Sequence, residues 1–372
     1  MPLTTDLLDV TEAARAAEAQ RRRGAFHTLT VSDVEPLTDD SAAITFDVPD
    51  ELRADYGFAA GQSLTLRRTV DGEEQRRTYS ICSPQGAAPR IGVREVPGGV
   101  FSRWLLRELR PGDRVEVQTP SGSFRADPDV AARHLCIAAG SGITPMMSIA
   151  STVLANPGSS VTLLFGNRTT GSVMFAEELA DLKNRYGPRL DLKHVLSREP
   201  REVDLFSGRL EADRLRTLLT TFVPLAAVDH VWLCGPFDMV AAARDVLAEL
   251  GVEPAKVHVE LFCVDQPPPQ LRHPDQVVEG ATTEVTVLLD GRSTTLAAAQ
   301  DTTVLDSAQG ARPDLPVACK GGVCGTCRAK VVDGEVDMVR NYALEDAEVA
   351  QGFVLTCQSF PTGERVTVDY DA

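Results

Sequence analysis

The sequence lacks several features that would each have indicated a class of protein. No apolar run among its 372 residues approaches the length of about 20 residues that crosses a bilayer. The first 24 residues contain no apolar core of a secretory signal, so we expect a cytoplasmic protein with no membrane association. Basic residues are in deficit, with 37 Lys and Arg against 53 Asp and Glu and a net charge of −16. A nucleic-acid-binding protein needs a basic surface, so that class is excluded.

Patterns typical of hydrolytic or acid–base sites are also missing. No nucleophile stands in a pattern with a base, there is no internal repeat, and no metal-ligand spacing occurs outside one cysteine loop. The histidines are scattered, and each is expected to be structural or solvated rather than a ligand. They are His27, His134, His194, His230, His258 and His273.

Three segments differ in the spacing of their apolar residues along the chain. Residues 25–130 contain short alternating stretches bounded by Gly, Pro and Asp, which predict a small antiparallel β-barrel with one helix. Residues 131–262 alternate apolar strands with helical stretches, which predicts an α/β unit with a parallel sheet. After a proline-rich linker at 263–282, residues 283–372 form a third unit with strands and a helix. We expect a multidomain chain, preceded by a tail at 1–24 to which no function is assigned.

Cysteines are crowded in the last 54 residues of the chain, where four of the eight lie. They have the pattern C-x4-C-x2-C followed, after 29 intervening residues, by the fourth, which is the plant-type [2Fe–2S] spacing. A zinc site would more usually show two C-x2-C pairs, and a redox dithiol would need no further cysteines; both stay open as alternatives. The expected cluster ligands are Cys319, Cys324, Cys327 and Cys357. For Cys82, Cys136 and Cys263 the expectation is a packed thiol.

Two glycine-rich turns precede helices. The stretch AAGSGITPMMSI (138–149) follows a predicted strand and opens a helix, where Gly140 and Gly142 permit close approach of a phosphate to free N–H groups. Taken alone it could be a plain tight turn, but its place at the first strand–helix junction of the α/β unit favours a nucleotide site. The second turn, PGGVFSRWL (97–105), follows the strand that ends in RTYS (77–80). By itself RTYS could be an ordinary strand end with Tyr79 in the core.

With these motifs in this order, the chain resembles the ferredoxin–NADP reductase superfamily with a β-grasp [2Fe–2S] ferredoxin fused at its C-terminus. The resemblance covers about residues 25–372. RTYS matches the flavin motif, and Gly98, Gly99 and Ser102 match the pyrophosphate motif. The nicotinamide-nucleotide motif is matched by Gly140, Gly142, Thr144 and Pro145, and the last strand–helix signature by Cys234, Gly235, Pro236 and Met239.

The resemblance implies a role for each matched residue. Arg77, with Thr78, would bind the FAD pyrophosphate, Tyr79 would lie on the isoalloxazine, and Ser80 would hydrogen-bond near flavin N5. Cys234 would touch the nicotinamide. Phe262, in HVELF, would occupy the aromatic position beside the flavin, with a simple core aromatic as the alternative.

The choice of nicotinamide nucleotide depends on cations near the ribose. Arg168 follows the second parallel strand, and Ser197 and Arg198 follow the third in a stretch that resembles the 2′-phosphate site of plant-type reductases. An NAD-specific site would more often carry an acidic residue after the second strand. We therefore predict NADPH over NADH, the alternative being that these arginines are only surface cations.

Together the motifs predict a route for electrons from NADPH through FAD and a [2Fe–2S] cluster to an external acceptor. The stretches FHTLTVSDVEPLTDDSAAITFDVP and CKGGVCGTCRAKVVDGEVDMVRNYALEDAEVAQGFVLTCQSFP are similar to the reductase subunits of phenylacetyl-CoA epoxidases. That narrower resemblance implies a di-iron oxygenase subunit complex as the electron acceptor and a place in phenylacetate catabolism. The alternatives are the reductase of another multicomponent oxygenase, hydroxylase or desaturase, and a non-catalytic redox-sensing iron–sulfur module.

Overall fold

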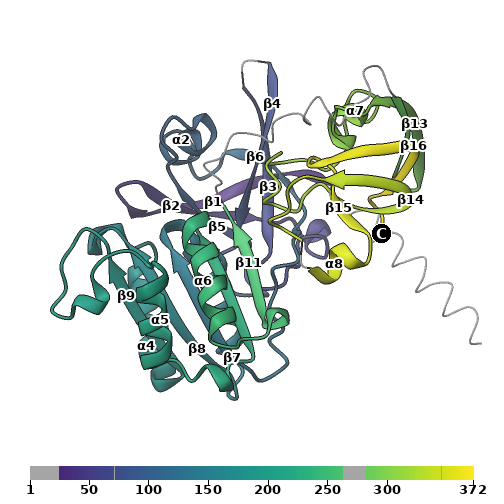
Figure 1. Ribbon diagram of the computed structural model, residues 1–372. Coiled ribbons are helices and arrows are strands. Elements are labelled where there is room, and N and C mark those ends of the chain that lie inside the picture. Colours follow the sequence, from purple (N-terminus) through teal and green to yellow (C-terminus); the bar gives the residue numbers. More distant parts are fainter. Residues whose placement is uncertain (1–24, 71, 263–281, 345) are drawn as a thin grey trace, which may run out of the picture.

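A computed structural model describes residues 25–70, 72–262, 282–344 and 346–372 (Figure 1). The expectations for the tail at 1–24, for Cys263 and His273, and for all but the last residue of the linker lie outside these residues. Three sheets of six, five and five strands organise the described part of the chain.

The first sheet is antiparallel and has the strand order β4-β3-β6-β1-β2-β5. A bridge between Ile81 and Ile91, with a hydrogen bond of 2.7 Å from Cys82 N to Arg90 O, joins its first and last strands into a barrel. Alternate side chains fill the interior, including the fully buried Leu64. The elements are β1 (Phe26–Thr38), β2 (Ser41–Asp47), β3 (Ser63–Val70), β4 (Glu73–Ser80), β5 (Arg90–Arg94), α2 (Val100–Arg107) and β6 (Arg114–Gln118).

The second sheet is parallel throughout, in the order β11-β10-β7-β8-β9. Its elements are β7 (Arg133–Ala139), α3 (Ile143–Val153), β8 (Ser160–Asn167), α4 (Ala176–Tyr186), β9 (Leu190–Leu196), α5 (Ala212–Phe222), β10 (His230–Gly235), α6 (Phe237–Glu249) and β11 (Val257–Leu261). Helices α3 and α4 share one apolar cluster with the sheet, and α5 and α6 share another on the opposite face. Strand β11 was not predicted as a strand.

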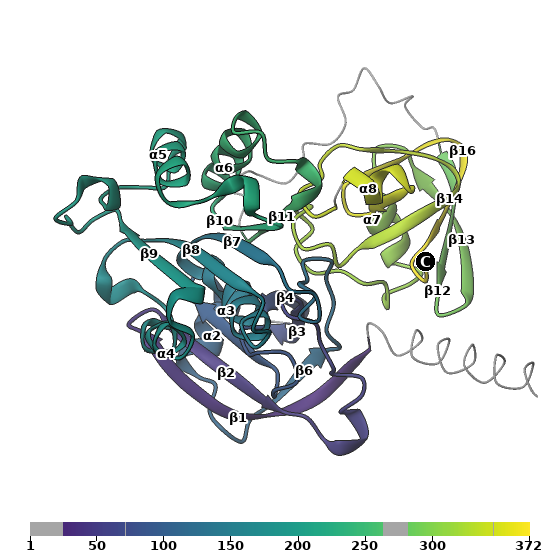
Figure 2. The same ribbon diagram turned by 90° about the horizontal axis from the view of Figure 1, so that it is seen from below.

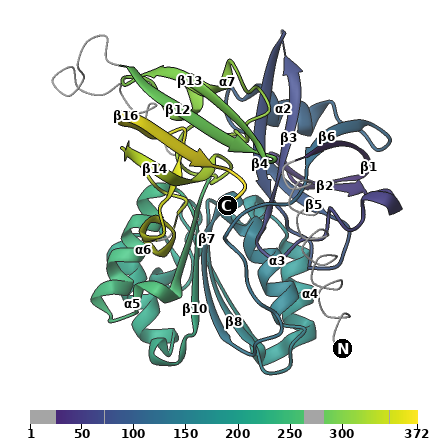
Figure 3. The ribbon, with the colours of Figure 1, turned by 90° about the vertical axis from the view of Figure 1, so that its right-hand side faces the viewer.

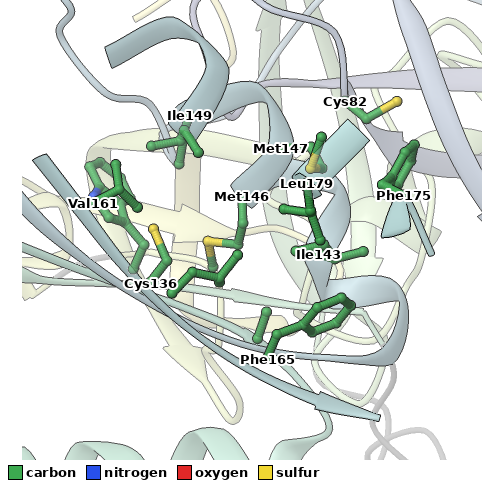
Figure 4. Packing of buried hydrophobic residues seen from close by; sticks show 14 of the residues in the cluster. Cys82, Cys136, Ile143, Met146, Met147, Ile149, Val161, Phe165, Phe175 and Leu179 are labelled. Atoms are coloured by element: carbon green, nitrogen blue, oxygen red, sulfur yellow. The ribbon is translucent and has the colours of Figure 1, made fainter. Parts of the chain in front are cut away.

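Helix α3 is buried on almost every side. Figure 4 shows Ile143 and Met146 packed over Cys136 and Phe165 of the sheet. Barrel residues, including Cys82, belong to the same cluster, so α3 lies between the sheet and the barrel. A helix in that position has almost no solvent face, which explains why it is mostly apolar and why even its Thr144 and Ser148 are buried.

The third sheet is mixed, in the order β13-β12-β16-β14-β15, with β12 and β16 parallel and the other pairs antiparallel. Its elements are β12 (Thr282–Leu289), β13 (Arg292–Ala299), α7 (Val304–Gln309), β14 (Arg328–Met338), α8 (Asp346–Ala350), β15 (Phe353–Leu355) and β16 (Ser359–Asp369). Residues 310–327, which include three of the clustered cysteines, connect α7 to β14. The predicted combination of barrel, α/β unit and α+β unit is confirmed.

The third unit lies against both of the others (Figures 2 and 3). Arg76 of the barrel is buried and donates a hydrogen bond of 3.3 Å to the carbonyl of Leu315. On the other side, Val323 is packed into the apolar cluster beneath α5 and α6, and the rings of Tyr342 and Phe237 meet edge to face at 5.3 Å. No helix in the described ranges is both long and apolar enough to cross a membrane.

Candidate functional site

The carboxyl ends of all five parallel strands meet at one edge of the second sheet. Gly140 follows β7, Ser197 follows β9, Pro236 follows β10 and Phe262 follows β11. Ligands of open α/β sheets bind outside this edge, and the turn after β7 opens helix α3 toward it. The structure thus brings together residues that are more than 120 positions apart in the chain.

Ser80, Cys234 and Glu260 form a buried polar group between the barrel and the sheet. The Ser80 hydroxyl donates to Glu260 Oε2 at 2.9 Å, and Cys234 Sγ lies 3.9 Å from the same oxygen. Burial raises the pKa of Glu260 to about 7, although the hydrogen bonds from Ser80 and Cys234 favour the carboxylate. Burial and then the neighbouring Glu260 raise the pKa of the Cys234 thiol well above its usual value, so the sulfur carries its proton.

Glu260 is a site residue that the sequence analysis missed. In HVELF it stands one position before the last residue of strand β11, which pairs with β10 so that Glu260 is level with Cys234. An acidic residue between apolar ones, in the stretch HVELF, was the available signal; the strand it lies on is a half-buried edge strand. Phe262, which was singled out instead, is partly buried and packs against the cluster around α3.

The RTYS residues take different environments along β4. Arg77 is exposed and donates to the carbonyl of Arg76 at 2.6 Å, while Thr78 Oγ1 lies 3.1 Å from Thr65 Oγ1. The ring of Tyr79 lies 6.4 Å from that of Phe101, and burial raises the pKa of its phenol. An exposed guanidinium beside a mostly covered aromatic ring suits an anionic cofactor with a flat ring system.

The second glycine turn leads into helix α2. Gly98 has φ of +74°, and a side chain at Gly99 would press on Ser102 Oγ and Val96, so both positions need glycine. Ser102 Oγ accepts a hydrogen bond of 3.0 Å from Val96 N, and this bond closes the turn. Because the hydroxyl is used in this way, a ligand would meet the N–H groups of the helix instead. A pocket of about 380 Å³ opens here, lined by both glycines and by Arg68 and Trp104. The Arg68 guanidinium lies 4.5 Å over the Trp104 ring. These groups fit the phosphates and the aromatic base of a dinucleotide.

The first glycine turn packs directly on the last residues of β10. A Cβ at Gly142 would overlap the carbonyl group of Cys234, and one at Gly235 would come within 2.8 Å of Met239 Cε. Thr144 donates to Ser141 O at 3.0 Å, within the same turn. The third residue of helix α3 is Pro145, a position whose N–H has no partner within the helix.

An arginine that the sequence analysis did not select, Arg94 of the barrel, lies against this turn. Its Nη1 would be 3.3 Å from a Cβ at Gly140, its Nη2 donates to Ser172 O at 2.6 Å, and its Nε donates to Asp40 Oδ1 at 3.1 Å. Arg168, the predicted phosphate ligand, also donates to Asp40, at 2.6 Å. Burial disfavours the charge of Asp40, but the two guanidinium groups and a threonine hydroxyl outweigh it and lower the pKa of the carboxyl. Arg168 is therefore already paired.

Ser197 and Arg198 lie beside Arg168, as expected from the parallel strand ends. Ser197 N donates to Asn167 O and Arg198 N to Arg168 O, each at 2.8 Å. The Arg198 side chain is exposed and makes no ion pair with any described residue. Glu199 is occupied, because it accepts from the N–H and the hydroxyl of Thr170, and these bonds lower its pKa.

The four clustered cysteines are brought together by the loop after α7 and the end of β15. The thiols influence each other in pairs, because Cys324 lowers the pKa of Cys319 and Cys327 lowers that of Cys357. Together with N–H groups of the loop, Cys324 lowers the pKa of Cys319 to about 5. The loop backbone turns through positive φ at Lys320, Gly322 and Gly325, which directs N–H groups inward.

This donor set fits an iron–sulfur cluster. Four thiols surrounded by backbone N–H groups match the ligands and the sulfur hydrogen bonding of a plant-type [2Fe–2S] centre. Among the described residues no group of three or more His, Cys, Asp or Glu side chains is arranged to hold a single metal ion. Cys82 and Cys136 are buried thiols whose pKa is raised by burial, as expected of packed cysteines.

Three of the histidines that look scattered in the sequence gather around Trp232. Trp232 Nε1 donates to His134 Nδ1 at 3.2 Å, and His230 Nδ1 lies 3.2 Å from His258 Nε2. Burial lowers the pKa of His134 to about 4, so this ring is neutral. The group packs the amino-terminal end of the sheet, opposite to the edge with the glycine turns.

Comparison with known families matches each unit separately. Residues 28–126 match the oxidoreductase FAD-binding domain, residues 136–245 the oxidoreductase NAD-binding domain, and residues 287–362 the 2Fe-2S iron-sulfur cluster binding domain. FAD, a pyridine nucleotide and a [2Fe–2S] cluster are therefore the cofactors of this chain.

Several known proteins align with this chain over nearly its whole length. A 1,2-phenylacetyl-CoA epoxidase component from Escherichia coli K12 is 42% identical over 93% of this chain and 98% of that protein. The ferredoxin reductase component of 3-ketosteroid-9-alpha-monooxygenase from Mycobacterium tuberculosis is 34% identical over 92% and 95%. Phthalate dioxygenase reductase, described as a modular structure for electron transfer from pyridine nucleotides to [2Fe-2S], shares the fold with a TM-score of 0.57 and 23% identity over 93% of this chain and 98% of that chain.

Proposed function

This chain belongs to the ferredoxin–NADP reductase-like oxidoreductases that carry a C-terminal [2Fe–2S] ferredoxin domain, and on that premise we propose that it is the reductase of a multicomponent oxygenase. It takes electrons from NADPH and passes them through FAD and the cluster to the di-iron oxygenase subunit of a phenylacetyl-CoA epoxidase. The observation that carries this assignment is the 42% identity with the Escherichia coli epoxidase component along 98% of its length.

We assign the three units to the three cofactors. The FAD-binding domain spans residues 25–130, the nicotinamide-binding domain 131–262 and the ferredoxin domain 283–372. In the flavin domain Arg77, Thr78 and Tyr79 hold the cofactor, and the turn at Gly98, Gly99 and Ser102 meets its pyrophosphate. The nucleotide is held by Gly140, Gly142, Thr144, Pro145, Gly235, Pro236 and Met239. The cluster is held by Cys319, Cys324, Cys327 and Cys357.

The polar group of Ser80, Cys234 and Glu260 supports hydride delivery at the junction of the two larger domains. The flavin and the cluster together supply the conversion of a two-electron donor into single electrons. Ser80 and the protonated Cys234 present small polar atoms at the junction of the two domains, both directed at Glu260 Oε2. Glu260, whose pKa lies near 7, holds or releases a proton at Oε2 as the charge beside Ser80 changes. Phe262 covers the site as a positioning aromatic.

NADPH is our proposal for the nucleotide, and Arg198 is the residue that carries it. The exposed Arg198 is available for a 2′-phosphate, whereas Arg168 is held by Asp40. Ser197, at the adjacent position, offers a hydroxyl to the same phosphate.

Replacing Arg198 with Ala should therefore weaken the binding of 2′,5′-ADP by about tenfold and leave 5′-AMP binding unchanged, because a charge-assisted bond contributes about 1.5 kcal/mol or more. Calorimetric titration of the holoprotein measures both. Arg185→Ala, which removes an exposed arginine on helix α4, is the matched control. Equal weakening of both nucleotides would remove Arg198 from the 2′-phosphate site.

The order of the cofactors predicts separable losses. Replacing Cys324 with Ser should abolish the reduction of cytochrome c, which depends on the cluster, while ferricyanide reduction, fed by the flavin, survives at more than half its rate. The two assays on the same preparation give the ratio. Parallel loss of both activities would contradict a cluster that lies downstream of the flavin.

The experiment that tests the acceptor follows NADPH consumption when the protein is mixed with a di-iron phenylacetyl-CoA epoxidase complex, with and without phenylacetyl-CoA. Consumption that depends on the substrate and matches epoxide formation supports the assignment. The 34% identity with a 3-ketosteroid-9-alpha-monooxygenase component favours a second candidate, the reductase of another oxygenase. Brisk cytochrome c reduction without stimulation by the epoxidase would select that candidate.

A further inference from the structure

Gln358, the residue directly after the fourth cysteine, is a polar side chain with no exposed surface. It enters strand β16 from the short turn that follows β15, and its Cγ lies beneath Gly322, where a Cβ would come within 3.1 Å of it. The side chain thus lies under the cysteine loop, on the side away from solvent. A wholly buried amide needs a reason, because burying an amide without full hydrogen bonding lowers the free energy of unfolding.

The amide nitrogen of Gln358 joins the two sides of the cysteine loop. Nε2 lies 2.9 Å from the carbonyl of Lys320, 2.8 Å from the carbonyl of Cys357 and 3.4 Å from Cys357 Sγ. Lys320 has φ of +51°, so the carbonyl that receives this bond belongs to a residue held in a left-handed conformation. Because Nε2 carries only two hydrogens, the carbonyl and the sulfur of Cys357 share one N–H. One side chain therefore fixes the first turn of the loop and also directs a shared donor at a ligand sulfur.

The other half of the amide has no partner. Gln358 Oε1 is buried and accepts no hydrogen bond from any described residue. Leaving a buried acceptor unsatisfied costs about 1–3 kcal/mol, so an apolar side chain of similar volume would pack here with less penalty. Glutamine must therefore be favoured here by the hydrogen bonds that its Nε2 donates to the loop carbonyls and to the sulfur.

We propose that Gln358 is a positioning residue that raises the reduction potential of the [2Fe–2S] cluster by donating its amide N–H to Cys357 Sγ. Adding an electron to the cluster increases the negative charge on its sulfur ligands, and an N–H donor stabilises the reduced state more than the oxidised one. The effect is strengthened because the bond lies in a buried, low-dielectric place. The inference rests on the cluster and not on which oxygenase receives the electrons.

The test is an EPR-monitored redox titration of the holoprotein carrying Gln358→Met, which keeps the length of the side chain and removes its donors. We expect the equilibrium constant for cluster reduction to fall about tenfold, which corresponds to 59 mV for one electron. The g-values of the reduced cluster should shift as well, and ferricyanide reduction should stay unchanged.

Gln309→Met is the matched control, because Gln309 accepts a bond of 2.9 Å from Lys320 Nζ and no hydrogen bond joins it to a cysteine among the described residues. Its potential should equal that of the unmodified protein. Gln358→Glu, which places an acceptor and a negative charge beside Cys357, should lower the potential at least as far as the Met variant. An unchanged potential in a fully loaded Gln358→Met protein would overturn the proposal. So would loss of the cluster from both Gln358 variants, because Gln358 would then serve assembly rather than the potential.

Discussion

Glu260 shows how one side chain can take its properties from residues far away in the chain. No neighbour in the stretch HVELF alters the chemistry of its carboxyl group. In the fold, however, strand β11 places Glu260 next to Ser80 of the barrel and Cys234 of the adjacent strand. Burial then raises its pKa to about 7, close to the physiological range in which a proton is easily held or released.

Replacing Glu260 with Gln should remove a dependence of stability on pH. The folded protein holds this proton until pH 7, whereas the unfolded chain loses it near pH 4.3, so ionisation destabilises the fold as the pH rises through that interval. Relative to the unmodified protein, the variant should gain up to about 3 kcal/mol between pH 4.5 and pH 8. Melting temperatures of both proteins across that range measure the difference.

The exposed Glu253→Gln variant serves as the comparison, and it should follow the unmodified protein at every pH. In the same Glu260 variant, the rate of NADPH oxidation should lose the change with pH that the unmodified protein shows near pH 7. A stability difference that does not vary with pH would mean that Glu260 is not held near its ionisation point.

At the scale of elements, the turn between β7 and α3 is the tightest junction of the second sheet. Gly142 lies so close to the carbonyl of Cys234 that no side chain fits between them, and Gly140 adopts φ of +56°. The close approach places the start of α3 beside the loop after β10, which aligns two strand ends at one site. Packing by itself therefore requires glycine at this junction.

Replacing Gly142 with Ala should push the two strand–helix junctions apart. We expect a loss of about 2–3 kcal/mol in stability, as for overpacked cores, and at least a tenfold weaker binding of NADPH. Calorimetric melting and nucleotide titration measure these effects. Gly171→Ala offers a control in the neighbouring loop, since a Cβ there meets nothing within 4 Å. Unchanged stability and nucleotide binding in the Gly142 variant would mean that the two strand–helix junctions can move apart without cost.

At the scale of the whole molecule, the ferredoxin domain contacts the loop that carries the Cys-Gly-Pro signature. Phe237, directly after Pro236, meets Tyr342, and the Tyr342 N–H donates to Gly322 O in the cysteine loop. Val323 of that loop packs beneath helix α6. The cysteine loop is thus held beside the carboxyl ends of β10 and β11, where the buried polar group lies.

Replacing Phe237 with Ala should slow the passage of electrons to the cluster without affecting the flavin. An edge-to-face pair contributes about 0.5–1.5 kcal/mol beyond its buried area, so the rate of cytochrome c reduction should fall about two- to tenfold while ferricyanide reduction is retained. The ratio of the two rates is the measurement. Phe222→Ala, on helix α5, removes an exposed phenylalanine whose ring meets Phe206 and the ammonium of Lys193, away from the ferredoxin domain, and it should leave the ratio unchanged.

The three units, the glycine turns and the cysteine spacing could be read from the sequence, because alternation of apolar residues, glycines before helices and cysteines at a ligand spacing are local patterns. FAD came from the resemblance to a known family. Gly98, Gly99 and the cysteines could be found without long-range information, because they stand in short patterns of consecutive residues. Gly142 is in addition required by its contact with the carbonyl of Cys234, far away in the chain.

Only the tertiary structure decided which side chains meet. It paired Glu260 with Ser80 across 180 positions, tied Arg168 to Asp40 of another domain, brought Arg94 to the glycine turn and aimed the Gln358 amide at Cys357. Such contacts depend on how strands from separate units are ordered and docked, and a single sequence carries no record of that order. Burial likewise sets the charge state of Glu260, and burial is a property of the folded chain.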